Sequence, residues 1–91
     1  HLIDPRTMAS ASTDAVQCTV VGDNALECEI YAKVILILGS KEGVDWFLQT
    51  TAGHHFEVLL ITDNEEKIYA GSKENWKTHW AGVEPDQFYY R

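Results

Sequence analysis

Residues 25–39 constrain the fold of this chain more than any other stretch. Their first half alternates apolar with mainly polar side chains, in the order Leu26, Glu27, Cys28, Glu29, Ile30 and Tyr31. An alternation with a period of two is typical of a half-buried strand. Residues 34–38 are apolar throughout and rich in β-branched side chains, which favours a strand that is covered on both faces. The stretch therefore predicts one long strand that reaches the middle of a sheet.

A second strand is predicted just before this one, at residues 16–21. The intervening Gly-Asp-Asn has the composition of a turn, so the two strands are expected to form a hairpin. In the register that makes one face wholly apolar, Cys18 lies opposite Cys28. Neighbouring strands hold such Cβ atoms about 4.5–5.5 Å apart, wider than the roughly 3.8 Å of an unstrained disulfide. We therefore expect two reduced thiols, and the cysteine spacing also lacks the Cys-x-x-Cys pattern of a zinc site.

The chain beyond this hairpin is predicted to form a helix, a second hairpin and a second helix. Apolar residues at helical spacing predict the first helix at residues 41–51, with Ser40 as its N-cap. Residues 56–62 and 67–71 have strand composition and flank a polar turn. Residues 72–82 are expected to form the second helix, since a serine can cap its start and a glycine can end it.

This order of elements, ββα-ββα, predicts an α+β domain of two layers. The expected architecture is a four-stranded, mainly antiparallel sheet with both helices packed on one face. Residues 15–91 would form this single domain, after a flexible N-terminus of small polar residues at 8–14. Residues 1–7 precede the only methionine of the chain and are interpreted as a vector-derived remnant.

The charge balance argues against some classes of partner. The chain has 7 Lys and Arg residues against 14 Asp and Glu residues, which gives a formal net charge of -7. Such a field repels a phosphate backbone, so we expect no nucleic-acid binding. The acidity would serve solubility or the binding of a basic protein partner. No apolar run approaches the roughly 18 residues of a membrane span and no export signal is recognisable, so a cytoplasmic protein without membrane contact is expected.

No sequence pattern points to catalysis. His54 and His55 are adjacent, and because successive strand residues face opposite ways, the pair is interpreted as part of a solvated loop. The serines beyond the N-terminal tail are expected to be helix caps, and both cysteines to be buried where nothing lowers a thiol pKa. No phosphate-binding glycine motif or HExxH zinc motif is present. We therefore predict no catalytic residue, no metal site and no cofactor.

Aromatic side chains crowd towards the C-terminus, at Trp76, Trp80, Phe88, Tyr89 and Tyr90. Aromatic crowding with few lysines nearby is typical of protein contact surfaces, although the two tryptophans would also suit a core. The favoured function is a small acidic interaction module without catalysis. It is expected to form a homodimer, the commonest oligomer of small domains. Its interface residues are predicted to be Phe88, Tyr89 and Tyr90.

Two alternatives remain open at this point. One is a different dimer geometry, in which the short strand at residues 67–71 pairs edge to edge with a second copy. The other is a different function, a small-molecule-binding or minor enzymatic domain. Its pocket would lie around the second helix, at Trp76, His79 and Trp80.

Overall fold

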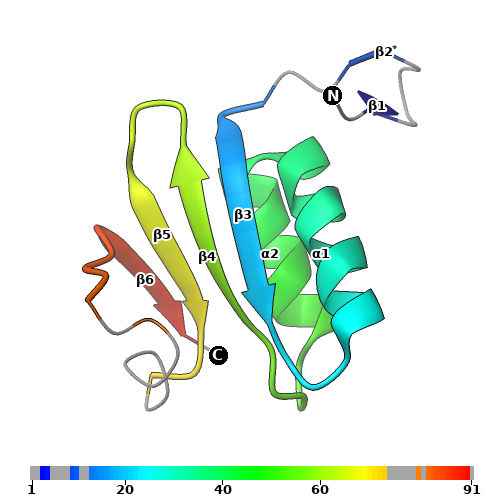
Figure 1. Cartoon of the computed structure of the whole chain (residues 1–91), viewed down its shortest axis with the longest axis vertical. Coiled ribbons are helices and arrows are strands. Elements are labelled where there is room, and N and C mark those ends of the chain that lie inside the picture. The colour runs from blue at the N-terminus through cyan, green and yellow to red at the C-terminus, as the bar shows by residue number, and fades with distance from the viewer. Residues whose placement is uncertain (1–2, 5–8, 11–12, 74–79, 81, 91) are drawn as a thin grey trace.

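The computed structural model describes residues 3–4, 9–10, 13–73, 80 and 82–90. Along the chain its elements are β1 (Ile3–Asp4), β2 (Ala9–Ser10), β3 (Ala15–Val21), α1 (Ala25–Leu38), α2 (Ser40–Thr50), β4 (Glu57–Thr62), β5 (Lys67–Gly71) and β6 (Gln87–Tyr90). β1 and β2 form a small antiparallel ladder, and the other strands form a four-stranded sheet in the order β3-β4-β5-β6. Figure 1 shows α1 and α2 together on one face of that sheet. The predicted α+β class is confirmed.

The sheet is mixed, with one parallel pair at its edge. β3 pairs with β4 and β4 with β5 in antiparallel fashion, so that Val20 lies opposite Val58 and Leu60 opposite Ile68. β6 then joins β5 in parallel. The predicted helix at residues 41–51 and the predicted hairpin at 56–62 and 67–71 correspond to α2, β4 and β5. The predicted helix at residues 72–82 lies largely outside the described residues.

The prediction of a long strand at residues 25–39 is wrong, because this stretch forms α1. Its alternating half also places apolar residues at a helical spacing, and Cys28, Tyr31 and Ile35 turn towards the core. The helix begins with a side-chain cap, since the Asn24 amide oxygen accepts a hydrogen bond of 3.0 Å from the Glu27 N–H. Packing therefore outweighs the small penalty that β-branched residues carry in a helix.

The predicted first hairpin is wrong for the same reason. With residues 25–38 in a helix, β3 pairs with β4 instead, and Cys18 lies opposite Leu60 rather than Cys28. The two cysteines are free thiols on a strand and a helix, and both pack against the same core. The element order in this part of the chain is accordingly βααβ, not ββα.

The core lies between the sheet and the two helices. Its fully buried members include Ile35 of α1, Phe47 of α2, and Val58 and Leu60 of β4. α1 and α2 approach closely at Gly43, where an added Cβ would lie 2.9 Å from a methyl carbon of Ile35. A glycine is required at that position because the backbone of one helix rests on the side chain of the other.

Asp14 joins the start of β3 to the start of α2. Its Oδ1 accepts a hydrogen bond of 2.8 Å from the Ser40 N–H, and its Oδ2 accepts one from the Ser40 hydroxyl. The predicted N-cap, Ser40, is thus inside the helix, and the capping carboxylate comes from 26 residues earlier in the chain. These hydrogen bonds from Ser40 lower the pKa of Asp14 below its ordinary value of 3.8.

None of the helices in the described part of the chain has the length and apolarity that a bilayer crossing needs.

Replacing Asp14 by Ala is expected to lower the free energy of unfolding by about 1 kcal/mol at neutral pH, because α2 loses its capping carboxylate. The folded-state pKa of Asp14 is depressed, so this stabilisation is present above pH 3.8 and disappears as the pH falls through the lowered value. Urea denaturation at neutral and at acidic pH measures both effects. Asp45→Ala, on the exposed side of the same helix, is the control. A difference between Asp14→Ala and the parent that persists unchanged in acid would contradict the role of the carboxylate.

Helix α1 also provides a test of its own orientation. Ile35 is fully buried and Leu26 is 67% exposed, so Ile35→Ala is expected to cost about 2–5 kcal/mol of unfolding free energy. Leu26→Ala should stay within about 0.5 kcal/mol. Thermal and urea unfolding of both variants decide between these values. Similar losses at the two positions would rule out the packing described for α1.

Candidate functional site

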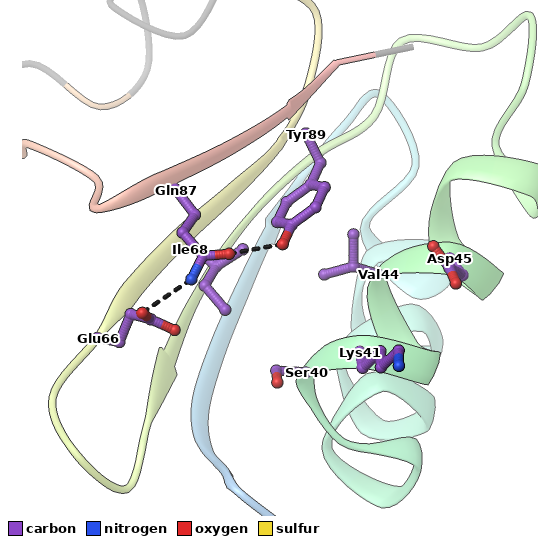
Figure 2. A pocket seen from close by; sticks show the side chains of 8 residues that line it. All are labelled: Ser40, Lys41, Val44, Asp45, Glu66, Ile68, Gln87 and Tyr89. Atoms are coloured by element: carbon purple, nitrogen blue, oxygen red, sulfur yellow. Dashed lines mark hydrogen bonds between the residues drawn. The ribbon is translucent and has the colours of Figure 1, made fainter.

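A cavity of about 330 Å³ opens between α2 and the β5–β6 edge of the sheet (Figure 2). Its volume falls at the small end of the range for ligand pockets, about 300–1,000 Å³. The residues that line it are Ser40, Lys41, Val44 and Asp45 from α2, Glu66 and Ile68 from β5 and the turn before it, and Gln87 and Tyr89 from β6. Segments far apart in the sequence therefore build it together.

Hydrogen bonds fix the wall that β6 contributes. The Gln87 side chain donates a bond of 2.8 Å from Nε2 to Oε2 of Glu66, and the Tyr89 hydroxyl donates one of 2.5 Å to Oε1 of Gln87. Figure 2 shows this chain of bonds, with the Tyr89 hydroxyl turned towards Gln87. The start of β6 is anchored as well, since Asp86 accepts a bond of 2.8 Å from the Lys67 N–H and its own N–H donates one of 2.7 Å to the Lys67 carbonyl.

The charges around the cavity limit what it can bind. Lys41 brings one ammonium group, while Asp45 and Glu66 bring two carboxylates. The N-terminus of α2, which elsewhere would attract an anion, already has the carboxylate of Asp14 against it. Val44, Ile68 and the Tyr89 ring supply apolar surface. The cavity therefore suits an uncharged aromatic or a zwitterionic group better than a phosphate.

The predicted interface residues lie together on β6 but face two ways. Phe88, Tyr89 and Tyr90 are 38%, 41% and 40% exposed. Tyr89 lines the cavity on the helix side of the sheet. Phe88 and Tyr90 contact the ring of Tyr69 on the opposite side, with centroid distances of 6.1 and 6.2 Å. The structure thus divides the expected patch between the two faces of one edge strand.

Of the alternative pocket residues Trp76, His79 and Trp80, the described part of the chain includes Trp80. Trp76 and His79 lie outside the described residues. Trp80 is buried, and its indole N–H has no hydrogen-bond partner among the residues that the structure describes. Trp80, the described member of the three, does not line the cavity of Figure 2.

Sequence reasoning missed a buried polar pair on the far face of the sheet. Glu57 is almost completely buried and Tyr69 completely so, and the Tyr69 hydroxyl lies 2.5 Å from Oε1 of Glu57. The same hydroxyl is 2.7 Å from the carbonyl oxygen of Ser72. Gly71 makes room for the pair, because a Cβ there would lie 2.8 Å from Cγ of Glu57. The signal in the sequence that could have revealed this pair is Glu57, a glutamate in an otherwise mostly apolar strand.

Nucleophilic and metal chemistry finds little support in the described residues. Burial raises the pKa of Cys18 to about 12. Burial, and then the charges of Asp23 and Glu27, also raise the pKa of Cys28. Both thiols therefore stay protonated and unreactive at neutral pH. His54 and His55 are exposed in the loop before β4, as predicted, and the described residues contain no group of three His, Cys, Asp or Glu side chains suited to a metal ion.

Comparison with known proteins gives one family. The family model described as "ApbE family" matches residues 1–59, which is more than half of the 91 residues. The matched range starts at residue 1, so it includes the segment that was interpreted as a vector-derived remnant, and it extends through β3, α1 and α2 into β4. No significant match was found among curated proteins or solved structures. On the family match, the chain belongs to the ApbE family.

Proposed function

We propose that this protein takes part in flavin transfer. The observation that carries the proposal is the match of residues 1–59 to the ApbE family, a family of flavin transferases. That range holds both helices and the first strand of the main sheet, which form much of the core with β4. The similarity therefore covers the structural centre of the domain and is not confined to a peripheral motif.

The cavity between α2 and β6 is the candidate place for the flavin ring. An isoalloxazine ring is planar, uncharged and edged with hydrogen-bonding groups. Tyr89, Val44 and Ile68 offer it apolar contact, and Gln87 offers it a polar edge. Asp45 and Glu66 oppose a phosphate in the same space. The phosphate of a flavin nucleotide would therefore point out of the cavity.

Flavin fluorescence tests this proposal. Titrating the protein into riboflavin and into FMN is expected to give saturable changes, with riboflavin bound at least as tightly as FMN. Tyr89→Ala should weaken binding by about tenfold, since such an aromatic contact contributes roughly 1.5 kcal/mol.

Tyr90→Ala is the matched control, because Tyr90 is equally exposed on the same strand but lies on the other face. If Tyr89→Ala and Tyr90→Ala lose the same affinity for flavin, the cavity is not the flavin site. A protein that binds neither flavin, and that transfers no flavin from FAD, with release of AMP, to the hydroxyl groups of a mixture of acceptor proteins, would contradict the proposed function itself.

A second candidate function, self-association, is favoured by the position of β6. This strand is the last in the order β3-β4-β5-β6, and it exposes three neighbouring aromatic side chains. An edge strand with apolar side chains readily pairs with a second copy. The earlier edge candidate at residues 67–71 is wrong, because β5 has β4 on one side and β6 on the other. In this proposal the homodimer forms through β6.

Light scattering coupled to gel filtration is the measurement for the homodimer. At tens of micromolar the expected mass is about twice the 10.3 kDa of the chain. Phe88→Ser together with Tyr90→Ser should shift the protein towards the monomer, because both replace exposed aromatic surface by a small polar group. Val16→Ser, on the opposite edge strand β3, is the control. A monomeric mass for the parent protein would reject self-association.

A further inference from the structure

Helix α1 is unusually apolar for a helix at the surface. Apolar side chains are distributed around its whole circumference, yet Ile35 is its only fully buried residue. A helix that is apolar on all sides is normally enclosed by other elements. In Figure 1, α2 and β3 cover α1 from one side, and its other side faces away from the sheet and from α2. That open side has no covering element in the described part of the chain.

The open side carries an apolar line, which we name the outer stripe: Leu26, Ile30 and Ile37. The exposed Lys33 lies on the same side of the helix, between Ile30 and Ile37. Leu26 is 67% and Ile30 is 48% exposed, while Ile37 is half-buried. Positions 4 and 11 residues apart lie nearly above one another on an α-helix. At 1.5 Å per residue the stripe is about 16 Å long, the length of an ordinary contact between two helices.

The borders of the outer stripe are acidic. Glu27 and Glu29 project on its two sides, and Asp23 precedes the first turn; all three residues are exposed. Lys33 is the one basic residue of the helix, and its Nζ lies 3.2 Å from Oε1 of Glu29, so its charge is already matched. A partner that covers the stripe must therefore meet unbalanced negative charge at its edge.

We infer that the outer stripe of α1 is a docking surface for an amphipathic helix whose apolar face is bordered by Lys or Arg. A helix is the fitting occupant because its own backbone groups are already hydrogen-bonded and its side-chain ridges pack between those of α1. A second copy of this chain fits less well. It would bring a further net charge of -7 and another set of the same carboxylates to the contact. This inference rests on α1 alone and is independent of the cavity and of flavin.

The probe is a synthetic amphipathic helical peptide with a leucine stripe flanked by lysines. Amide NMR spectra of the isotope-labelled 91-residue protein should show saturable shifts concentrated in residues 23–37. Affinity should fall by about tenfold or more between about 0.1 M and about 1 M NaCl, where the Debye length drops from about 10 Å to about 3 Å. The same peptide with glutamates in place of the lysines should not bind.

Surface variants distinguish binding at the outer stripe from nonspecific attraction between the basic peptide and an acidic protein. Leu26→Ser and Ile30→Ser should each weaken binding by about tenfold. Val16→Ser is the matched control, since Val16 is also an exposed apolar residue, 58% accessible, but lies on β3. The inference would be overturned if the acidic peptide bound as tightly as the basic one, or if Val16→Ser weakened binding as much as Ile30→Ser. It would also be overturned if the NMR shifts spread over the whole acidic surface. So would a dimer of this chain that Ile30→Ser dissolves.

Discussion

The contact between α1 and α2 is the constraint on which the rest of the structure depends. It holds because Gly43 has no side chain and lets the α2 backbone rest on Ile35. Beside this contact, the ring of Tyr31 meets Trp46, Phe47 and Phe56 edge to face, at centroid distances of 5.2–6.1 Å. The two helices thereby act as one layer, whose inner side covers β4. Since the helix pair connects β3 to β4, its compactness also brings those two strands into register.

The sequence correctly predicted the elements whose pattern of apolar and polar residues allows a single interpretation. The spacing of apolar residues in α2 is helical only, and the polar turn between β4 and β5 requires a hairpin. α1 was misread because its apolar residues satisfy a period of 2 and a period of 3.6 at once. The deciding signal was present in Asn24 and Glu27, a capping residue followed three positions later by glutamate. The pairing of β3 with β4 depends on that assignment. The single error in α1 therefore gave β3 the wrong partner strand and placed Cys18 opposite Cys28 instead of Leu60.

The cavity could not be predicted from the sequence for a different reason. No residue that lines it is unusual in its own segment, and the site arises where α2, β5 and β6 close around a space. Its α2 wall lies inside the range matched to the ApbE family, whereas Glu66, Ile68, Gln87 and Tyr89 come after residue 59. The range matched to the family therefore supplies Lys41 and Asp45, and the part of the chain after it supplies Glu66 and the β6 wall of the cavity.

The parallel strand β6 has a position unlike that of the other strands in the main sheet. Within the described residues, each member of the core cluster lies at or before Ala70, so β6 contributes a cavity wall without contributing to that cluster. It is attached by its ladder with β5, by the hydrogen bonds between Asp86 and Lys67, by Gln87 with Glu66, and by the rings of Phe88 and Tyr90 against Tyr69. Undocking of β6 would then abolish the cavity and uncover the Tyr69 ring, while the core cluster between the helices and β3, β4 and β5 loses none of its members. By thermodynamic linkage, any molecule held in the cavity must raise the free energy of local opening of β6 by as much as it gains from binding. Occupancy of the cavity and order of the C-terminal strand are therefore two readouts of a single equilibrium.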